Sequence, residues 1–294
     1  MTTIAIQSSN IRTAKKRRRT TRAQIGRLVT CVVLSVIGWF YLFPFWWMVA
    51  GSLKTKNEFF SRPLSLIPQE WFFANYVDAW NKAKFGTYFL NTVFVACCVV
   101  GGVIIFSSMA AYALARTEFP GKRILQTIIV VTLFLPAGYT IIPVYEIMLK
   151  LHLTNTIWAI IILGIAGATG FNAFLYWGYF ATIPREFEEA AVIDGASFVQ
   201  TFWRVVFPLA KPMTGTVALM TLLGVWNDFF TPMIFTLNKP HLRTLAVGMY
   251  AFVSENSRDW TAMLAAAIIT LTPIILTFIF LQRYFVEAIS GAVK

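Results

Sequence analysis

The sequence predicts an all-α membrane protein with six transmembrane helices. Hydrophobic residues make up 57% of the 294 residues and charged residues only 13%, a balance that excludes an ordinary soluble domain. Six mainly apolar segments are each long enough to cross the roughly 30 Å hydrocarbon core of a bilayer. They are approximately 28–51, 89–113, 124–148, 156–180, 212–236 and 261–284. We therefore expect one transmembrane domain over 28–294, with no length left for a second, catalytic domain.

A basic tail, 1–27, precedes the first apolar segment, and we expect it to be disordered and cytoplasmic. An RNA-binding arm is less favoured, because no aromatic residues that could stack on bases interleave the charges. The segment 28–51 is too long for the apolar region of an ordinary signal peptide, although Ala50-Gly51-Ser52 consists of small residues like those at a signal-peptide cleavage site. The tail holds eight basic residues: Arg12, Lys15, Lys16, Arg17, Arg18, Arg19, Arg22 and Arg27.

The distribution of Lys and Arg predicts the orientation of the chain. With the N-terminus inside, the inner segments carry 16 of the 25 basic residues and the outer segments carry 9. Basic residues concentrate on the cytoplasmic side of membrane proteins, so both termini and the polar segment 184–208 are expected inside. Without the tail the counts are 8 and 9, so the tail decides this prediction.

Between the first two spans, the long connection 54–88 is rich in aromatic residues. Residues 75–85 are expected to form a short amphipathic helix at the membrane surface, with Tyr76, Ala79, Trp80 and Ala83 on one face. Two interpretations are equally favoured for this helix: a platform for an extracytoplasmic partner, and an aromatic anchor in the interface.

Polar side chains inside the spans are candidates for a substrate pathway. A charge near the centre of a bilayer costs about 2.5–3.5 kcal/mol, so such a residue normally faces a cavity or a partner. The alternative is that the side chain makes a hydrogen bond between helices. For an Asn in a membrane helix this structural role is as common as contact with a substrate, and for Asp228 the two roles are equally favoured. Glu146 is better explained as a residue near a helix end. The candidates are Asn91, Asn172, Asn227 and Asp228.

No pattern in the sequence predicts an enzyme. The cysteines Cys31, Cys97 and Cys98 fall in predicted spans, and their spacing suggests neither a metal site nor a disulfide framework. The histidines His152 and His241 lie in outer connections, without a catalytic arrangement around them. A GxxxxGK[ST] phosphate loop is also missing from the sequence, so any ATP must be hydrolysed by another chain.

A charged stretch, 184–208, separates the fourth and fifth predicted spans. Pro184 suits a helix start, and acidic residues after it favour the positive end of the helix dipole. Asp194-Gly195 predicts a break, after which 196–206 forms a second helix that Pro208 ends. A helix–Gly–helix unit of this kind suits a handle for a partner, and an ordinary surface helix is the simpler alternative.

The same stretch resembles the EAA loop of bacterial ABC importer permeases, which has Glu-Ala-Ala, three residues, Gly, nine residues and Ile-x-Leu-Pro. Here Glu189-Ala190-Ala191, Gly195 and Pro208 keep that spacing, with Val205 for Ile and Phe207 for Leu. In the family this loop is gripped by the ATPase subunit. The resemblance thus implies an ATPase-coupling role for Glu188, Glu189, Ala190, Ala191, Asp194, Gly195 and Pro208.

Further motifs extend the resemblance to the carbohydrate importers of the maltose type, and in particular to their second, six-span permease. Glu287-Ala288 departs from the family, which often has Gly before its last motif. The motifs are 43–48, 51–54, Asn91-Thr92, 111–116, 119–122, Ile142-Pro143, 226–228, 282–285 and 291–294.

What the resemblance implies is a multi-pass protein of the bacterial cytoplasmic membrane that imports a sugar, a polyol or glycerol phosphate by alternating access. It implies as partners a homologous permease, two copies of an ABC ATPase that bind ATP and Mg²⁺, and an extracytoplasmic binding protein. An ATP-independent secondary transporter or channel is the alternative, but it leaves the large inner loop without a purpose. A membrane-embedded enzyme would need a reactive constellation that the sequence lacks.

Overall fold

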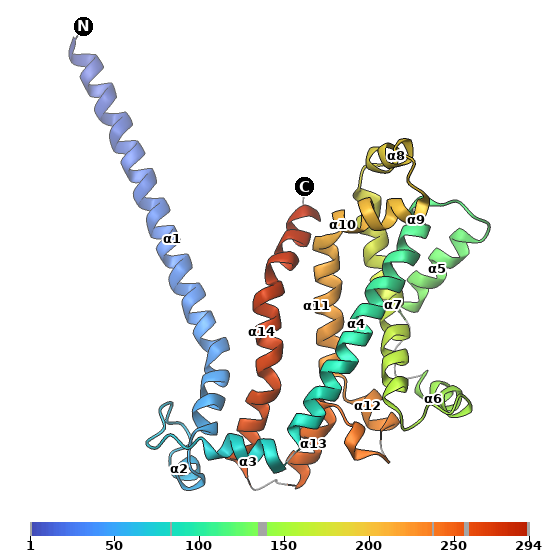
Figure 1. The fold of residues 1–294 in the computed structure, drawn as a ribbon. Coiled ribbons are helices and arrows are strands. Elements are labelled where there is room, and N and C mark those ends of the chain that lie inside the picture. Colours follow the sequence, from blue (N-terminus) through green and yellow to red (C-terminus); the bar gives the residue numbers. More distant parts are fainter. Residues whose placement is uncertain (1, 83, 135–139, 237, 256–258, 293–294) are drawn as a thin grey trace. The chain divides into compact units, whose positions relative to one another are not determined.

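The computed structural model describes residues 2–82, 84–134, 140–236, 238–255 and 259–292 (Figure 1). Within these ranges the chain forms helices and no strands, as the sequence predicts. It divides into two compact units, Met1–Phe73 and Ala74–Lys294. The second unit contains the 184–208 loop and is the one in which a functional site can be described.

The first unit begins with one long helix, α1 (Thr2–Ser52), followed by the short helix α2 (Lys56–Ser61). Its apolar part, Gly26–Ser52, contains the predicted first span. Helix α1 includes the 1–27 tail from Thr2 onward, where the sequence predicts disorder. Before Gly26 the sequence has neither Gly nor Pro, the two residues that most disfavour a helix interior.

Beyond α1, the connection in the first unit folds around a buried lysine. Lys54 is fully buried, and its Nζ donates to the carbonyl oxygens of Arg62 at 2.9 Å and Ser65 at 2.7 Å. Burial lowers the pKa of Lys54, and the negative charge of Glu58 partly opposes this shift. The Glu58 carboxylate accepts a hydrogen bond from the Gln69 amide at 2.8 Å. These bonds satisfy part-buried backbone groups of a connection that lies outside the helices.

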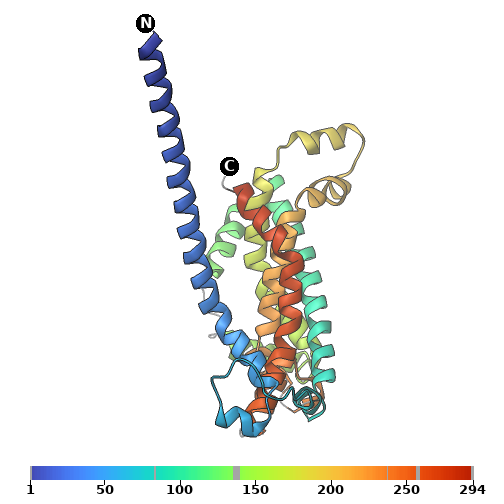
Figure 2. The same ribbon diagram turned by 90° about the vertical axis from the view of Figure 1, so that its left-hand side faces the viewer.

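The second unit is a bundle in which long helices run side by side (Figures 1 and 2). The 184–208 loop lies at one end of this unit, and shorter helices cover the opposite end. The long helices are α4 (Phe85–Arg116), α7 (Ile157–Thr182), α11 (Lys211–Asn227) and α14 (Trp260–Ala292). The shorter ones outside the loop are α3 (Ala74–Lys82), α5 (Lys122–Thr132), α6 (Ile141–Lys150), α12 (Phe230–Phe235), η3 (Pro240–Leu242) and α13 (Leu245–Glu255).

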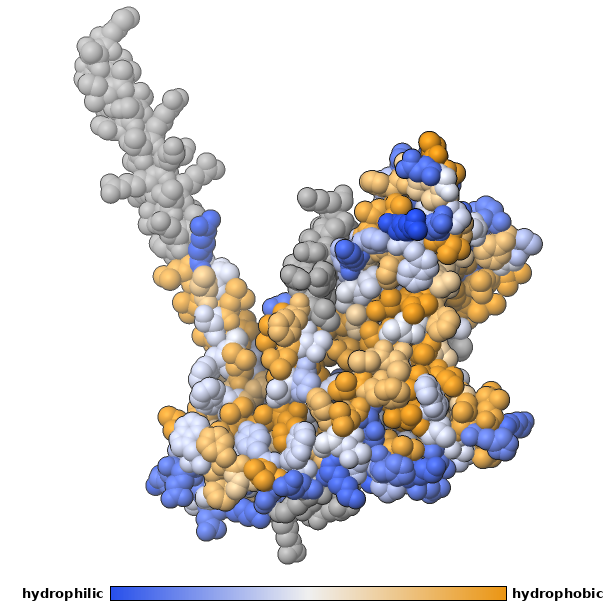
Figure 3. Space-filling view, viewed as in Figure 1, coloured by the Kyte–Doolittle hydropathy of each residue, from blue (hydrophilic) through white to orange (hydrophobic). Residues whose placement is uncertain are grey.

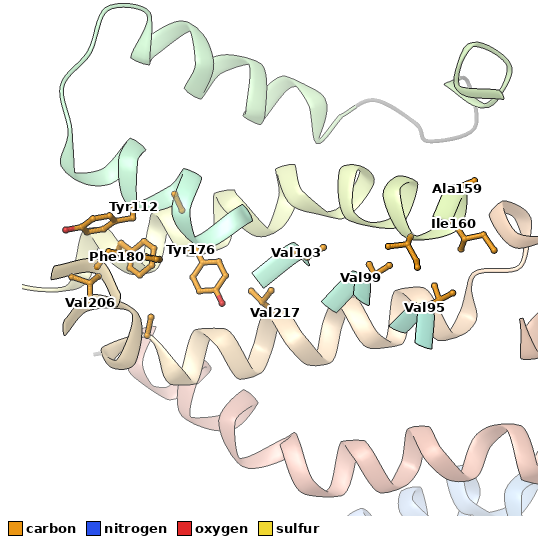
Figure 4. Close-up of a cluster of buried hydrophobic side chains, with 14 of the residues drawn as sticks. Val95, Val99, Val103, Tyr112, Ala159, Ile160, Tyr176, Phe180, Val206 and Val217 are labelled. Atoms are coloured by element: carbon orange, nitrogen blue, oxygen red, sulfur yellow. The ribbon is translucent and has the colours of Figure 1, made fainter. Parts of the chain in front are cut away.

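A core of alanine, branched aliphatic and aromatic side chains joins α4, α7 and α11 (Figure 4). Val95, Val99 and Val103 recur at every fourth residue of α4 and are fully buried. Glycine allows α7 to approach them, since a Cβ atom on Gly164 would lie 2.9 Å from the Val99 side chain. Small residues at such crossings are what helix association in a membrane requires, because lipid tails are as apolar as the side chains.

Two of the six predicted spans are not continuous helices. In place of 124–148, α5 ends at Thr132 and α6 begins at Ile141, and 135–139, which include Pro136, lie outside the described residues. In place of 212–236, α11 ends at Asn227 and α12 begins at Phe230. Four described helices are long and apolar enough to span a membrane, and a fifth span arises if the pair 198–209 and 211–227, bent by 78°, counts as one.

The predicted amphipathic helix at 75–85 is present as α3, but its inner face packs within the chain. Asn75 and Ala79 are buried, and α3 contacts α14 and α4 at the opposite end of the bundle. Trp80 stays 44% exposed, while the predicted face member Ala83 lies outside the described residues. Figure 3 shows polar residues gathered at the two ends of the second unit and apolar residues between them, as a bilayer requires.

Candidate functional site

The first arm of the 184–208 loop is a short acidic helix that ends at a left-handed glycine. Helix α8 (Glu186–Ile193) has three glutamates in its first turn, where the helix dipole favours negative charge. It closes in a Schellman motif, in which the Ala196 amide bonds to the Ala191 carbonyl at 2.9 Å and the Gly195 amide to that of Val192 at 3.0 Å. Gly195 has φ +83°, which explains why the chain has glycine there.

The second arm begins at a capping box rather than at 196. Ser197 Oγ accepts from the Gln200 amide at 3.3 Å, and Gln200 Oε1 accepts from the Ser197 amide at 2.9 Å. Three short helical pieces follow without a gap: α9 (Phe198–Thr201), the π-helical η2 (Phe202–Val206) and α10 (Phe207–Leu209).

Pro208 does not end this arm, contrary to the prediction, because the helix continues to Leu209. A proline lacks the N–H that a regular helix needs at that position. The structure accommodates it after a π turn, in which the Phe207 amide bonds to the Phe202 carbonyl. The chain then bends sharply into α11.

A nearly buried ion pair fastens the first arm to the last turn of α4. Glu188 Oε1 accepts from Arg116 Nε at 2.6 Å, and Glu188 Oε2 accepts from the Tyr112 hydroxyl at 3.1 Å. The Arg116 and Glu188 side chains are 8% and 14% exposed. Arg116 Nη2 also donates to the carbonyl of Ile183 at 2.7 Å. Ile183 directly follows α7 and precedes the loop. One guanidinium therefore holds both the exit of α7 and the first arm.

Aromatic packing fastens the second arm to the same turn of α4. The Tyr112 ring stacks on Phe198, with centroids 4.7 Å apart and an interplanar angle of 29°, and it contacts Phe202 at 5.0 Å. Phe180 of α7 meets Tyr112 edge-on at 6.1 Å, and Figure 4 shows the two rings at one end of the core. Aromatic pairs of this kind are worth about 0.5–1.5 kcal/mol beyond the area they bury.

The tip of the loop presents apolar side chains to its surroundings. Ile193 is 86% exposed, and Val192, Val199 and Phe187 are each at least half exposed. Glu189 and Asp194 are exposed beside them. A cluster of exposed apolar residues with charged neighbours is typical of a protein-binding surface.

The predicted coupling residues therefore face in two directions. Glu189, Ala190, Asp194 and Gly195 are exposed, whereas Glu188 and Ala191 face the bundle and Pro208 is half-buried. A Cβ atom on Gly195 would meet nothing within 4 Å in the described part of the chain, so its backbone conformation is what this glycine supplies. Tyr112, Arg116 and Phe198 were not predicted as site residues, because only the folded chain brings them to Glu188.

The four predicted pathway residues each have hydrogen-bond partners within the chain, and their role in a pathway stays a prediction. Asp228 is not inside a helix as expected: it follows α11, and its Oδ1 accepts from the amide of Thr231, in the first turn of α12, at 3.1 Å. None of the four lines the 530 Å³ apolar pocket between α4, α11 and α14. The other bonds run from Asn91 Nδ2 to the carbonyls of His241 and Arg243, from Asn172 Nδ2 to the Ala168 carbonyl and Thr221 Oγ1, and from Asn227 Nδ2 to the Leu223 carbonyl.

Comparison with known proteins shows the family of the chain. Residues 13–291 match the family described as "Binding-protein-dependent transport system inner membrane component". The chain belongs to this family. It is therefore a multi-pass permease component of a transport system, in agreement with the resemblance of its 184–208 loop to the EAA loop.

Individual relatives agree with the family. The chain is 32% identical to the melibiose/raffinose/stachyose import permease protein MelC of Bacillus subtilis over 94% of this chain and 99% of that one. It is 34% identical to the diacetylchitobiose uptake system permease protein NgcG of Streptomyces coelicolor over 84% and 82% of the two chains. A solved bacterial ABC transporter involved in alginate import superposes with a TM-score of 0.75 and 26% identity, covering 89% of this chain and 97% of that chain.

Proposed function

We propose that this permease forms half of the translocation pathway of an ATP-driven importer for a sugar or a related polyol or glycerol phosphate. Its partners are a second, homologous permease, two copies of an ABC ATPase subunit that bind ATP and Mg²⁺, and an extracytoplasmic binding protein. The alginate importer, MelC and NgcG all carry saccharides according to their descriptions, which supports a carbohydrate as the class of solute.

One observation carries the proposal: the loop with EAA spacing is a helix–Gly–helix hairpin with an exposed apolar tip. In our proposal this tip, with Ile193 and Val192 at its apex, docks on the ATPase. Glu189 and Asp194 lie at the rim of the contact. Both termini and the loop are cytoplasmic in this arrangement, because the ATPase works on that side of the membrane.

In this mechanism, ATP binding closes the ATPase dimer and draws the loops of the two permeases together. Rigid helices then rock and open the pathway toward the binding protein, as in other transitions between packed states. This chain supplies the loop and the helices that move, and the hydrolytic chemistry belongs to the partner. Asn91, Asn172, Asn227 and Asp228 remain proposed pathway residues.

Recovery of the ATPase with a tagged permease tests the proposal. Full burial of one isoleucine side chain is worth about 1.5–3 kcal/mol, so Ile193→Asp should reduce the affinity for the ATPase by about tenfold or more. Leu151→Asp is a matched control, because Leu151 is also exposed and directly follows α6, which lies at the opposite end of the unit. We expect the first variant to lose most of the ATPase and the second to keep it.

Three results would contradict the proposal. The first is normal ATPase recovery with Ile193→Asp, which would exclude the tip as the docking surface. The second is the absence of any ATPase from the unaltered complex, and the third is uptake that proceeds without ATP. A panel of radiolabelled sugars, polyols and glycerol phosphate, assayed with the cognate binding protein in proteoliposomes, then identifies the solute.

A further inference from the structure

Both carboxylate oxygens of Glu188 are bonded within the chain, although Glu188 stands next to the exposed Glu189. Both of its oxygens accept hydrogen bonds from α4, one from Arg116 and one from Tyr112. Its side chain is 14% exposed and that of Arg116 is 8% exposed. Charge-assisted bonds with this geometry are stronger than neutral ones and hold both partners in place. Within the 184–208 loop, Glu188 thus attaches the loop to the helix bundle rather than forming part of the exposed surface.

The two donors lie on one face of α4, because residues four apart on a helix are neighbours. Tyr112 binds both arms, since its hydroxyl reaches Glu188 in α8 and its ring stacks on Phe198 in the second arm. Arg116 also donates a hydrogen bond to the carbonyl oxygen of Ile183. All of these contacts come from the last two turns of α4, whereas α7 and α11 are joined to the loop through the main chain, and Phe180 of α7 also meets Phe202 edge-on at 6.5 Å.

At the opposite end, α4 is fixed to a different connection. Asn91 Nδ2 donates to the carbonyl of Arg243 at 3.0 Å, and Thr92 Oγ1 accepts from the amide of Leu245 at 2.7 Å. Between these two ends, the buried valines of α4 pack against α7 and α11. A single helix therefore connects the loop with the connection before α13, across the full length of the unit.

We propose that Arg116 is a positioning residue that makes α4 follow the loop when the ATPase pulls on it. Breaking the Arg116–Glu188 pair leaves the loop attached to α7 and α11 by the main chain and packed on the Tyr112 ring, but removes its ionic contact with α4. The ATPase can then still bind and hydrolyse ATP, while the movement no longer reaches the opposite end of α4. This inference rests on the proposed coupling to an ATPase.

A reporter at the far end of α4 tests this proposal without knowledge of the solute. Thr87 is exposed in the first turn of α4, and Thr87→Cys places a thiol there once Cys31, Cys97 and Cys98 are replaced by serine. The complete transporter is assembled in membranes, and the rate of maleimide labelling is measured with and without ATP and vanadate. With Arg116 present, we expect ATP to change this rate at least about threefold.

Three variants are compared with the reporter in place. Arg116→Met should abolish the effect of ATP on labelling while the recovered ATPase and its hydrolysis stay within about twofold of the unaltered complex. Arg116→Lys keeps the positive charge beside Glu188 and should restore at least half of the effect. Arg123→Met is the control, because Arg123 is an exposed arginine near the same end of the unit, and it should change nothing. If Arg116→Met does not accumulate, Glu188→Gln carries the same test without leaving a buried carboxylate unpaired.

Two outcomes would overturn the inference and leave the proposed function intact. One is an unchanged response to ATP in Arg116→Met, or no response even with Arg116 in place, since α4 would then not follow the loop through this pair. The other is loss of the ATPase from Arg116→Met, which would make the pair a support for the docking surface. Failure of the unaltered permease to recover any ATPase would instead contradict the proposed function.

Discussion

At the scale of single residues, Glu188 and Glu189 show how helix geometry separates two adjacent carboxylates. Successive residues of an α-helix point about 100° apart, because 3.6 residues complete a turn. Glu188 therefore faces Arg116 and Tyr112, whereas Glu189 is exposed. Because each glutamate sits in a different environment, a substitution at either position tests a different step: attachment of the loop to the bundle, or docking of the ATPase.

Gly195 gives a prediction at this scale. Its φ of +83° costs a residue with a Cβ atom roughly 1–2 kcal/mol, and asparagine tolerates that region better than other residues do. Gly195→Glu should leave membrane insertion intact but strain the Schellman turn and place a side chain on the docking surface. An overpacked contact costs about 1–3 kcal/mol, which corresponds to a roughly 5- to 150-fold loss of affinity for the ATPase.

Gly195→Asn serves as the comparison for this position. It keeps the turn, so ATPase recovery should exceed that of Gly195→Glu, and the measurement is ATPase recovered with the tagged permease alongside uptake. Normal recovery and normal uptake with Gly195→Glu would mean that this loop is not the coupling element.

At the scale of elements, the sequence predicted the arms of the loop better than it predicted their ends. Asp194-Gly195 predicted the helix break, because a left-handed turn leaves a local signature in the sequence. Pro208 was misread as a helix end, since the π turn that accommodates it depends on how Phe202 packs on Tyr112. Partners distant in the sequence, such as Arg116 for Glu188, could not be predicted from either element alone.

The interruptions in the predicted spans 124–148 and 212–236 were also missed in the sequence. Hydropathy averages over a window, so 212–236 is apolar enough for one helix even though the Asp228 side chain accepts from the Thr231 amide at the break between α11 and α12. The same reasoning applies to 124–148, where α5 and α6 are separate helices. The apolar length of a segment predicts that it can lie in a membrane, and it does not predict that the backbone is continuous.

The crossing of α4 and α7 gives a prediction at the scale of elements. A Cβ atom on Gly164 would lie 2.9 Å from the Val99 side chain, whereas one on Gly167, a turn away on the same helix, would meet nothing within 4 Å of described atoms. Gly164→Val should therefore force the helices apart at a cost of about 1–3 kcal/mol. Gly167→Val is the matched control. Thermal stability of the detergent-solubilised permease, followed by the loss of monodisperse protein, should fall only for Gly164→Val, and an equal loss for both variants would contradict this packing.

At the scale of the whole molecule, the distribution of charge predicts the orientation of the chain in the membrane. The tail 1–27 carries eight basic residues, and without it the two sides of the membrane would be almost evenly matched. Arg185 lies at the start of the 184–208 loop, next to the N-terminus of α8. If the loop docks on an ATPase, Arg185 and both termini must lie on the cytoplasmic side. The charge distribution and the proposed function therefore predict the same orientation.

Cysteine labelling tests that orientation directly. In a protein whose three native cysteines are replaced, Arg185→Cys should react with a membrane-impermeant maleimide only after the cells are opened. Leu151 is exposed and directly follows α6, at the opposite end of the second unit, so Leu151→Cys should react in intact cells and serves as the control. The expected contrast is close to all-or-none, because the probe does not cross the bilayer. Labelling at position 185 from outside intact cells would reverse the topology and, with it, remove the loop from the side on which ATP is hydrolysed.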